Sequence, residues 1–249
     1  MKKIIISTFS LFLSFSLFAQ KDSSDNLNGL FKKAGSVFSK NSSSSSSSNN
    51  LSSGEIISGL KEALSLGAQK SGDKLSKPDG FFKDAAVKIL LPKQVQDAEK
   101  KLRMFGMGKL VDKAELSMNR AAEDASKQAA PIFLASIKKM SVTDALNILR
   151  GTDTAATGYL RKSTTPELVA SFKPIIEESL KKTDANKYWK DVFSTYNSFS
   201  SKPVETDINT YVTNKALDGL FYYVAQEEVN IRKNPAGRVT DVLKSVFGK

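Results

Sequence analysis

The stretch DINTYVTNKALDGLFYYVAQEEVNIRK, residues 207–233, carries the longest helical pattern in the chain and is followed by Asn234 and Pro235. At about 100° per residue, the apolar side chains in its middle spread around the whole helical wheel: Leu217, Leu220, Phe221, Tyr222, Tyr223, Val224 and Ala225. A helix that is apolar on every side is typical of a protein interior. We therefore expect a long buried helix at the centre of the fold.

Charged residues enter the same helix near its C-terminal end. Glu228 precedes Arg232 by four residues, which is the favourable order for a helical ion pair. With Glu227 and, beyond the turn, Arg238, they form either a structural polar network or an anion-binding site built on the two arginines. Adjacent carboxylates also suggest the acid and base of a glycoside hydrolase, but neighbours on a helix point about 100° apart and do not face one substrate atom.

A second polar group, Asn119, Arg120 and Glu123, lies on another predicted helix. Arg120 and Glu123 are three residues apart and can pair along the helix surface. One interpretation is a solvated charged face. The other is that Glu123 or Arg120 turns inward, into a polar site shared with the central helix.

The composition excludes several kinds of chemistry. The chain has 249 residues, a formal net charge of +11, and neither Cys nor His. Thiol and imidazole nucleophiles, Cys/His zinc sites, haem ligation through His and disulfides are therefore all excluded. We predict no metal site and no cofactor. Any catalysis would have to rest on carboxylates, Lys, Tyr, Ser or Thr.

Residues 1–19 have the pattern of a secretory signal peptide. Lys2 and Lys3 precede an apolar run over residues 4–18, and Ala19 ends the segment. This run is short for a membrane span, which needs about 20 apolar residues, so the alternative of an uncleaved anchor is disfavoured. Without a Cys near the cut, a lipoprotein is excluded. We expect an exported protein, periplasmic or extracellular, with a formal charge of +9 once Lys2 and Lys3 are removed.

Residues 20–40 predict a basic amphipathic leader helix, because apolar residues recur at three- and four-residue steps among lysines. Its face for docking to a membrane surface or a partner would comprise Leu27, Leu30, Phe31, Lys32, Lys33, Val37 and Phe38. The alternative is that it packs on the main domain. Residues 41–50 follow, with seven consecutive serines at 42–48, and predict a flexible tether.

Residues 51–249 predict one all-α domain, a multi-helix bundle-like structure around the long buried helix, with few or no strands. Helix starts are indicated at three cap signals: Ser52-x-x-Glu55, Ser141 with Asp144, and Thr164-x-x-Glu167 with Pro166 in the first turn. Gly151 is the expected stop of the second of these helices. Residues 81–91 are apolar but too short for a core helix, and we expect an extended or irregular segment over the core.

Five blocks of this domain resemble a known family. They are LSSGEIISGLKEAL (51–64), DGFFKD (79–84), VDKAELSMNRAAEDA (111–125), GTDTAATGYLRK (151–162) and the stretch from LDGLFYYVAQEEV to SVFG (217–248). The chain is similar to the bacterial family catalogued as domain of unknown function 4197. This resemblance implies an exported helical domain with no established activity, so it supplies no catalytic residues. The leader and the serine tether lie outside it.

Three functions remain open from the sequence. The first is a non-catalytic envelope protein that binds a partner protein or an anionic ligand, which the missing Cys and His and the absence of a nucleophile motif favour. The second is a peripheral lipid-binding protein that docks through its leader. The third is a carboxylate-based hydrolase of envelope polymers. Export makes nucleic acid an unsuitable partner despite the charge.

Overall fold

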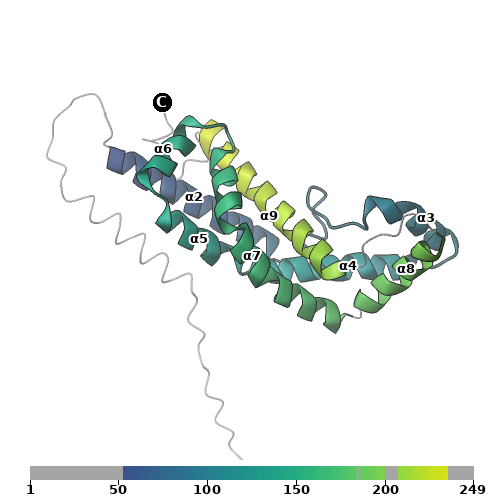
Figure 1. Ribbon diagram of the computed structural model, residues 1–249. Helices are drawn as coiled ribbons and strands as arrows, with labels where there is room; N and C mark the ends of the chain where they lie inside the picture. Colours follow the sequence, from purple (N-terminus) through teal and green to yellow (C-terminus); the bar gives the residue numbers. More distant parts are fainter. Residues whose placement is uncertain (1–52, 184, 200–206, 235–249) are drawn as a thin grey trace, which may run out of the picture. The chain divides into compact units, whose positions relative to one another are not determined.

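The computed structural model describes residues 53–183, 185–199 and 207–234 (Figure 1). The chain divides into two units, Met1–Asn49 and Asn50–Lys249, and every described residue belongs to the second. The predicted signal peptide, leader helix, tether and Ser52 lie outside the described residues, and so does Arg238. The described part consists of helices, turns and irregular segments without a strand: α2 (Ser53–Leu75), η1 (Lys93–Val95), α3 (Gln96–Met104), α4 (Gly108–Ser126), α5 (Ala129–Lys139), α6 (Val142–Arg150), α7 (Ala155–Lys182), α8 (Ala185–Phe199) and α9 (Ile208–Lys233).

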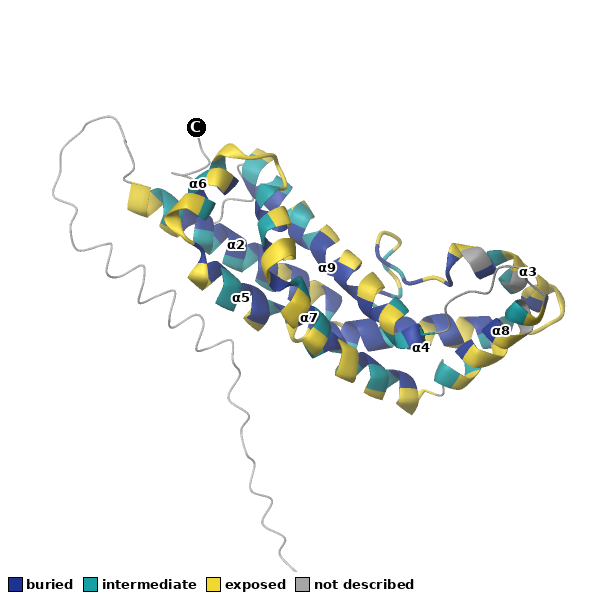
Figure 2. Ribbon diagram, in the orientation of Figure 1, coloured by how far each residue is buried: buried dark blue, intermediate teal, exposed yellow. Residues whose placement is uncertain are grey.

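The long helix α9 confirms the prediction made for residues 207–233. Asp207 is its N-cap, and the carboxylate accepts hydrogen bonds from the backbone amides of Asn209 and Thr210 at 2.9 and 3.2 Å. Helix α9 packs against α2, α4 and α7 (Figure 1). The buried residues gather where these helices face one another (Figure 2). The helix is not buried on all sides, however, because the Tyr222 side faces solvent, with 42% of that residue exposed.

Residues 76–92 connect α2 to the η1 turn as an irregular segment over the core, as predicted for residues 81–91. Phe81 and Ile89 are no more than 1% exposed. Room for Phe81 comes from Gly219 of α9, since a Cβ at that position would lie 2.6 Å from Cε1 of the phenylalanine ring. Gly219 of α9 and Phe81 of the irregular segment are therefore matched to each other.

Ser141 and Asp144 form the predicted capping box at the start of α6, and Gly151 is its C-cap. The helix start predicted at Thr164 is wrong, because α7 runs unbroken through Pro166 and Pro174. The Thr164 hydroxyl instead donates to the carbonyl of Leu160 at 2.6 Å. A continuous stripe of buried residues at four-residue steps holds the helix together across the prolines: Leu160, Thr164, Leu168, Phe172, Ile176 and Leu180.

Gly219→Ala is expected to lower the free energy of unfolding by about 1–3 kcal/mol, because the new methyl group overlaps the buried Phe81 ring. The matched control is Gly158→Ala in α7, where an added Cβ meets no atom within 4 Å. That substitution should instead stabilise by about 0.5–1 kcal/mol through helix propensity. Urea denaturation measures both, and equal effects at the two positions would contradict the packing between Gly219 and Phe81.

Candidate functional site

Asn119 of α4 holds the irregular segment by its backbone. Its side chain is fully buried. Its Oδ1 accepts from the amide of Ile89 at 2.8 Å, and its Nδ2 donates to the carbonyl of Ile89 at 2.8 Å. The same Nδ2 also donates to the carbonyl of Glu115 at 2.7 Å. The amide side chain therefore completes the backbone hydrogen bonds that a neighbouring strand would supply.

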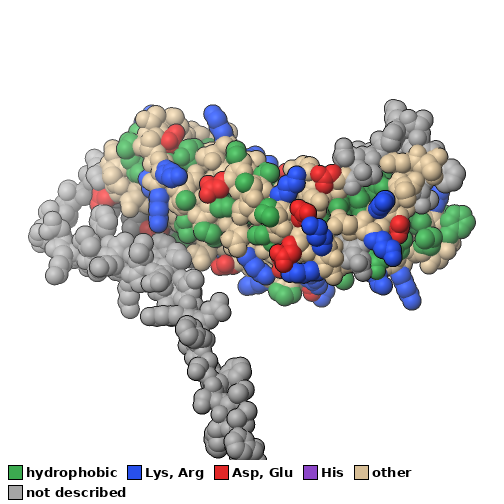
Figure 3. Space-filling view, turned by 60° about the horizontal axis from the view of Figure 1, so that its bottom comes forward, with side chains coloured by type: hydrophobic (Ala, Val, Ile, Leu, Met, Phe, Trp, Pro, Cys, Tyr) green, Lys and Arg blue, Asp and Glu red, His purple; other side chains and the backbone are tan. Residues whose placement is uncertain are grey.

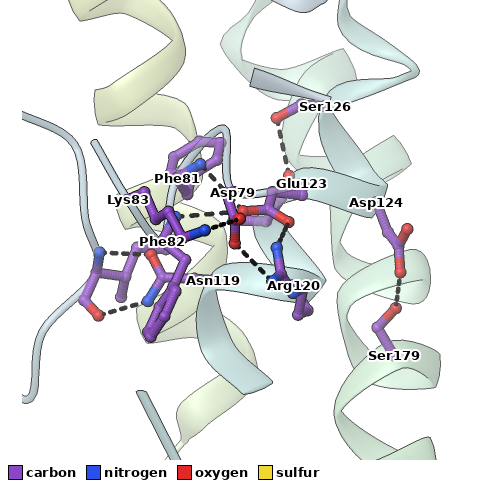
Figure 4. A network of polar contacts seen from close by, with 12 residues as sticks. Asp79, Phe81, Phe82, Lys83, Asn119, Arg120, Glu123, Asp124, Ser126 and Ser179 are labelled. Carbon is purple, nitrogen blue, oxygen red and sulfur yellow. Dashed lines mark hydrogen bonds and ion pairs between the residues drawn. The ribbon is translucent and has the colours of Figure 1, made fainter. Parts of the chain in front are cut away.

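Glu123 holds the other end of that segment (Figure 4). Its Oε1 accepts from the amides of Phe81 and Phe82 at 3.1 and 3.2 Å. Its Oε2 accepts from Arg120 at 2.6 Å, and Arg120 also donates to Asp79 at 2.6 Å. Glu123 is 3% exposed. The carboxylate is thus engaged at both oxygens by backbone and guanidinium donors.

Asp79 closes this network at the surface. It has a positive φ of 69°, a conformation that aspartate tolerates better than most residues. Its carboxylate pairs with Lys83 at 2.8 Å as well as with Arg120. Hydrogen bonds from Lys83 and Arg120 lower the pKa of Asp79 below its ordinary value. The expectation of a solvated face is therefore wrong for Asn119 and Glu123, and the inward-turned alternative finds its partners in residues 79–89 and not in the central helix.

A separate polar cluster joins α2, the irregular segment and α9. Asp84 accepts a short hydrogen bond from the Tyr223 hydroxyl and pairs with Lys74 at 3.1 Å. The Lys74 ammonium also lies 3.8 Å from the centre of the Tyr223 ring. Although burial alone would raise the pKa of Asp84, the hydrogen bonds from Tyr223 and Lys74 lower it. Burial and the neighbouring Asp84 raise the pKa of Tyr223.

Glu115 and Tyr211 border the last part of the segment. The Glu115 carboxylate is 3.4 Å from Lys88, and burial raises its pKa although the lysine opposes the shift. The Tyr211 hydroxyl donates to the carbonyl of Leu90 at 2.7 Å. Burial, together with the charge of Glu115, raises the pKa of Tyr211 to about 12. Tyr211 is therefore a neutral donor over the physiological range.

Glu228 of α9 caps the first turn of α7. Its carboxylate accepts from the amide of Ala156 at 2.9 Å, and from the amide and hydroxyl of Thr157, both at 2.8 Å. The local N-cap residue, Thr154, makes no side-chain cap hydrogen bond. A helix start leaves backbone amides without partners inside the helix. Here a residue more than 70 positions later in the chain supplies the acceptor.

Arg232 extends the cap to the preceding helix. Its Nε and Nη2 donate to Glu228 Oε1 at 3.1 and 2.9 Å, and Nη2 also donates to the carbonyl of Ile148 in the last turn of α6 at 2.8 Å. The two side chains are 13% and 5% exposed. One buried ion pair thus binds the end of α6 and the start of α7.

Glu227 lies apart from this pair, as helix geometry predicts. It pairs with Lys70 of α2 at 3.4 Å, and the two side chains are 26% and 47% exposed. The structure therefore brings together Asn119, Arg120 and Glu123 in one cluster, and Glu228 with Arg232 in another. Their partners belong to different segments, residues 79–89 for the first and the α6–α7 junction for the second.

Sequence reasoning missed Lys74, Asp84, Glu115, Tyr211 and Tyr223 as members of polar clusters. Their partners lie up to 139 residues away in the chain, so no local sequence spacing indicates these contacts. The DGFFKD block is the available signal, because a turn motif followed by two aromatics needs acceptors for its amides once it is buried.

A sequence model of a protein family, described as protein of unknown function (DUF4197), matches residues 50–248. The chain belongs to this family. Neither curated proteins nor solved structures gave a significant match. The clusters on α4 and α9 both lie inside the DUF4197 region.

Metal sites, hollows and membrane-spanning helices each bear on what the DUF4197 region can do. Within the described ranges, no group of three or more acidic side chains is arranged to hold a metal ion. A hollow of about 10 Å³ reaches Glu228 and Arg232, and is otherwise lined by Leu60, Ala63, Leu64 and Ile231. Ligand pockets usually measure about 300–1,000 Å³. None of the helices described is both long enough and apolar enough to cross a bilayer.

Glu228→Ala is expected to lower the free energy of unfolding by about 3 kcal/mol, because it removes the carboxylate that pairs with the buried Arg232 and uncaps α7. The neighbouring Glu227→Ala is the control, and should change stability by less than about 1 kcal/mol because its ion pair is exposed to solvent. Chemical denaturation of both variants provides the measurement. A loss below about 0.5 kcal/mol for Glu228→Ala would show that the cap adds little.

Glu115→Gln is expected to leave the protein at least as stable at about pH 7. The folded pKa of Glu115 is raised above 4.5, so its ionised form opposes folding at neutral pH. The loss of stability that ionised Glu115 causes in the wild type disappears as the pH falls through the folded pKa of Glu115 toward 4.5. The advantage of the variant should therefore shrink on acidification, as measured by urea unfolding at several pH values. Glu167→Gln, at an exposed position of α7, controls for the lost charge; an advantage that grows on acidification would contradict the assignment.

Proposed function

We propose that this protein is a non-catalytic binding protein of the cell envelope, which engages an anionic partner at its surface. The observation that carries the proposal is that its buried carboxylates already accept hydrogen bonds from backbone amides and arginines. Glu123 and Glu228 each accept from two backbone amides and from an arginine. A general acid or base must instead exchange a proton with substrate.

The hydrolase alternative has little geometric support. The carboxylates of Glu227 and Glu228 bind different elements, one through Lys70 of α2 and the other through the first turn of α7. A pair of glycosidase carboxylates must face the same bond. The hollow next to Glu228 is also small for a polymer subsite, and most of its lining is apolar.

Charge supports an anionic partner. The chain has 37 basic and 26 acidic residues. An excess of this size attracts polyanions over a distance set by the ionic strength, about 10 Å at 0.1 M salt. With export, which the N-terminal pattern predicts, the available polyanions are anionic lipids, lipopolysaccharide and wall polymers. Docking of the leader helix at residues 20–40 remains a second route to the same surface.

The test is binding of the purified full chain to dextran sulfate and to isolated envelope membranes at two ionic strengths. We expect binding at about 0.05 M salt that weakens at least tenfold at about 0.5 M, because the attraction is screened. The proposal would be contradicted if neither dextran sulfate nor the envelope membranes were bound in a salt-sensitive manner.

The carboxylates are tested in parallel with Glu123→Gln and Glu228→Gln. Both variants should lower the melting temperature and leave binding unchanged under conditions where they are folded. Turnover of an envelope polymer that disappears in either variant while the fold is retained would establish catalysis and overturn the non-catalytic function.

A further inference from the structure

The turn between α3 and α4 exposes three large apolar residues within four positions, two before a glycine and one after it. Met104 is 84% exposed, Phe105 is 80% exposed and Met107 is 46% exposed. Single exposed apolar residues are common on protein surfaces, but contiguous ones indicate an interaction site. We refer to residues 104–108 as the apolar tip.

The backbone of the apolar tip forms hydrogen bonds with the last turn of α3. Gly106 has a φ of 78°, which ends α3 in the left-handed conformation. Its amide donates to the carbonyl of Arg103 at 3.1 Å, and the amide of Met107 donates to the carbonyl of Leu102 at 2.8 Å. Leu102 is itself buried beneath the turn. With these backbone groups satisfied, the apolar side chains of the tip are presented outward from a fixed turn.

Lysines border the apolar tip. The three nearby acidic residues are already in ion pairs: Asp97 with Lys100 at 3.3 Å, and Glu99 and Asp112 with Arg103 at 2.9 and 2.8 Å. Lys101 and Lys109 are exposed on either side of the tip, and neither has an ion pair within the described part of the chain. Figure 3 shows hydrophobic side chains projecting where α3 and α4 meet, with Lys and Arg side chains close by. The surrounding charge is therefore positive.

We infer that the apolar tip inserts into the surface of a bilayer that carries anionic lipids. Met104 and Phe105 enter the boundary between headgroups and acyl chains, and Lys101 and Lys109 meet the headgroup phosphates. An apolar projection bordered by cations matches the layered chemistry of such a surface, whereas a soluble polyanion offers the apolar side chains nothing. This inference rests on the proposed binding of an anionic partner and names both the site and the partner.

The test uses the full chain, as purified from the producing cell. Flotation measures binding to vesicles of phosphatidylglycerol and phosphatidylcholine and to vesicles of phosphatidylcholine alone, and titration calorimetry measures binding to dextran sulfate as the soluble polyanion. The wild type should bind the anionic vesicles and not the neutral ones. The double variant Met104→Ser with Phe105→Ser should bind anionic vesicles at least about tenfold more weakly, since the buried apolar area is lost. It should bind dextran sulfate as the wild type does.

Two further variants complete the design. Lys101→Gln with Lys109→Gln should also weaken vesicle binding by about tenfold or more, through loss of attraction to the headgroups. Val142→Ser, at a 57% exposed apolar position of α6, is the control and should leave vesicle binding unchanged. All variants should keep the wild-type melting temperature, because the altered side chains are exposed.

The outcomes separate the two proposals. Vesicle binding that is absent in the wild type, unchanged in the tip variant, or equally reduced by Val142→Ser overturns the insertion of the tip. If dextran sulfate is still bound in a salt-sensitive manner in those cases, the proposed anionic partner stands and the membrane assignment alone fails. Loss of binding to both vesicles and dextran sulfate by the wild type overturns both.

Discussion

The carboxylate of Glu228 is the acceptor on which the α6–α7 junction depends. Helix α7 begins without a local side-chain cap, so its first amides need an acceptor from elsewhere. Glu228 supplies it from α9, and Arg232 carries the contact on to the last turn of α6. The central helix therefore fixes where one neighbour ends and the next begins, in addition to burying their apolar stripes.

The same solution appears at the other polar cluster. Asn119 and Glu123 provide the acceptors for the amides of Ile89, Phe81 and Phe82, none of which lies in a regular helix or sheet. A buried amide without a partner costs about 1–3 kcal/mol, and removing a carboxylate from water costs several kcal/mol. Because these magnitudes are comparable, each complete cluster adds little net stability, whereas removal of one partner leaves the other buried and is costly. In both clusters the acceptors bind backbone amides of residues 79–91 or of the α6–α7 junction.

The features that could be predicted from the sequence are the helix bounds and caps that depend on nearby residues. The span of α9, the Ser141 capping box and the Gly151 stop all follow from side chains within one or two turns. The start predicted at Thr164 failed because local proline and cap signals were overridden by a buried stripe that packs along α7. The role of Asn119 and Glu123 could not be predicted either, since their partners are 30 and 42 residues away. The ion pair of Glu228 and Arg232 could be predicted, but its use as a cap 72 residues from Ala156 could not.

The polar interior also bears on where a partner can be recognised. The charged side chains that penetrate the fold are bound to amides, carbonyls and each other, so they offer few free donors or acceptors to a ligand. Under the proposed binding function, recognition would rest on surface groups whose hydrogen-bond and ionic capacity is not already used. At the α3–α4 turn the acidic residues are paired, Lys101 and Lys109 have no ion pair with any residue that the structure describes, and the apolar side chains between them face solvent. An amphipathic partner that is both anionic and apolar satisfies both kinds of group at once, and a lipid surface has that combination.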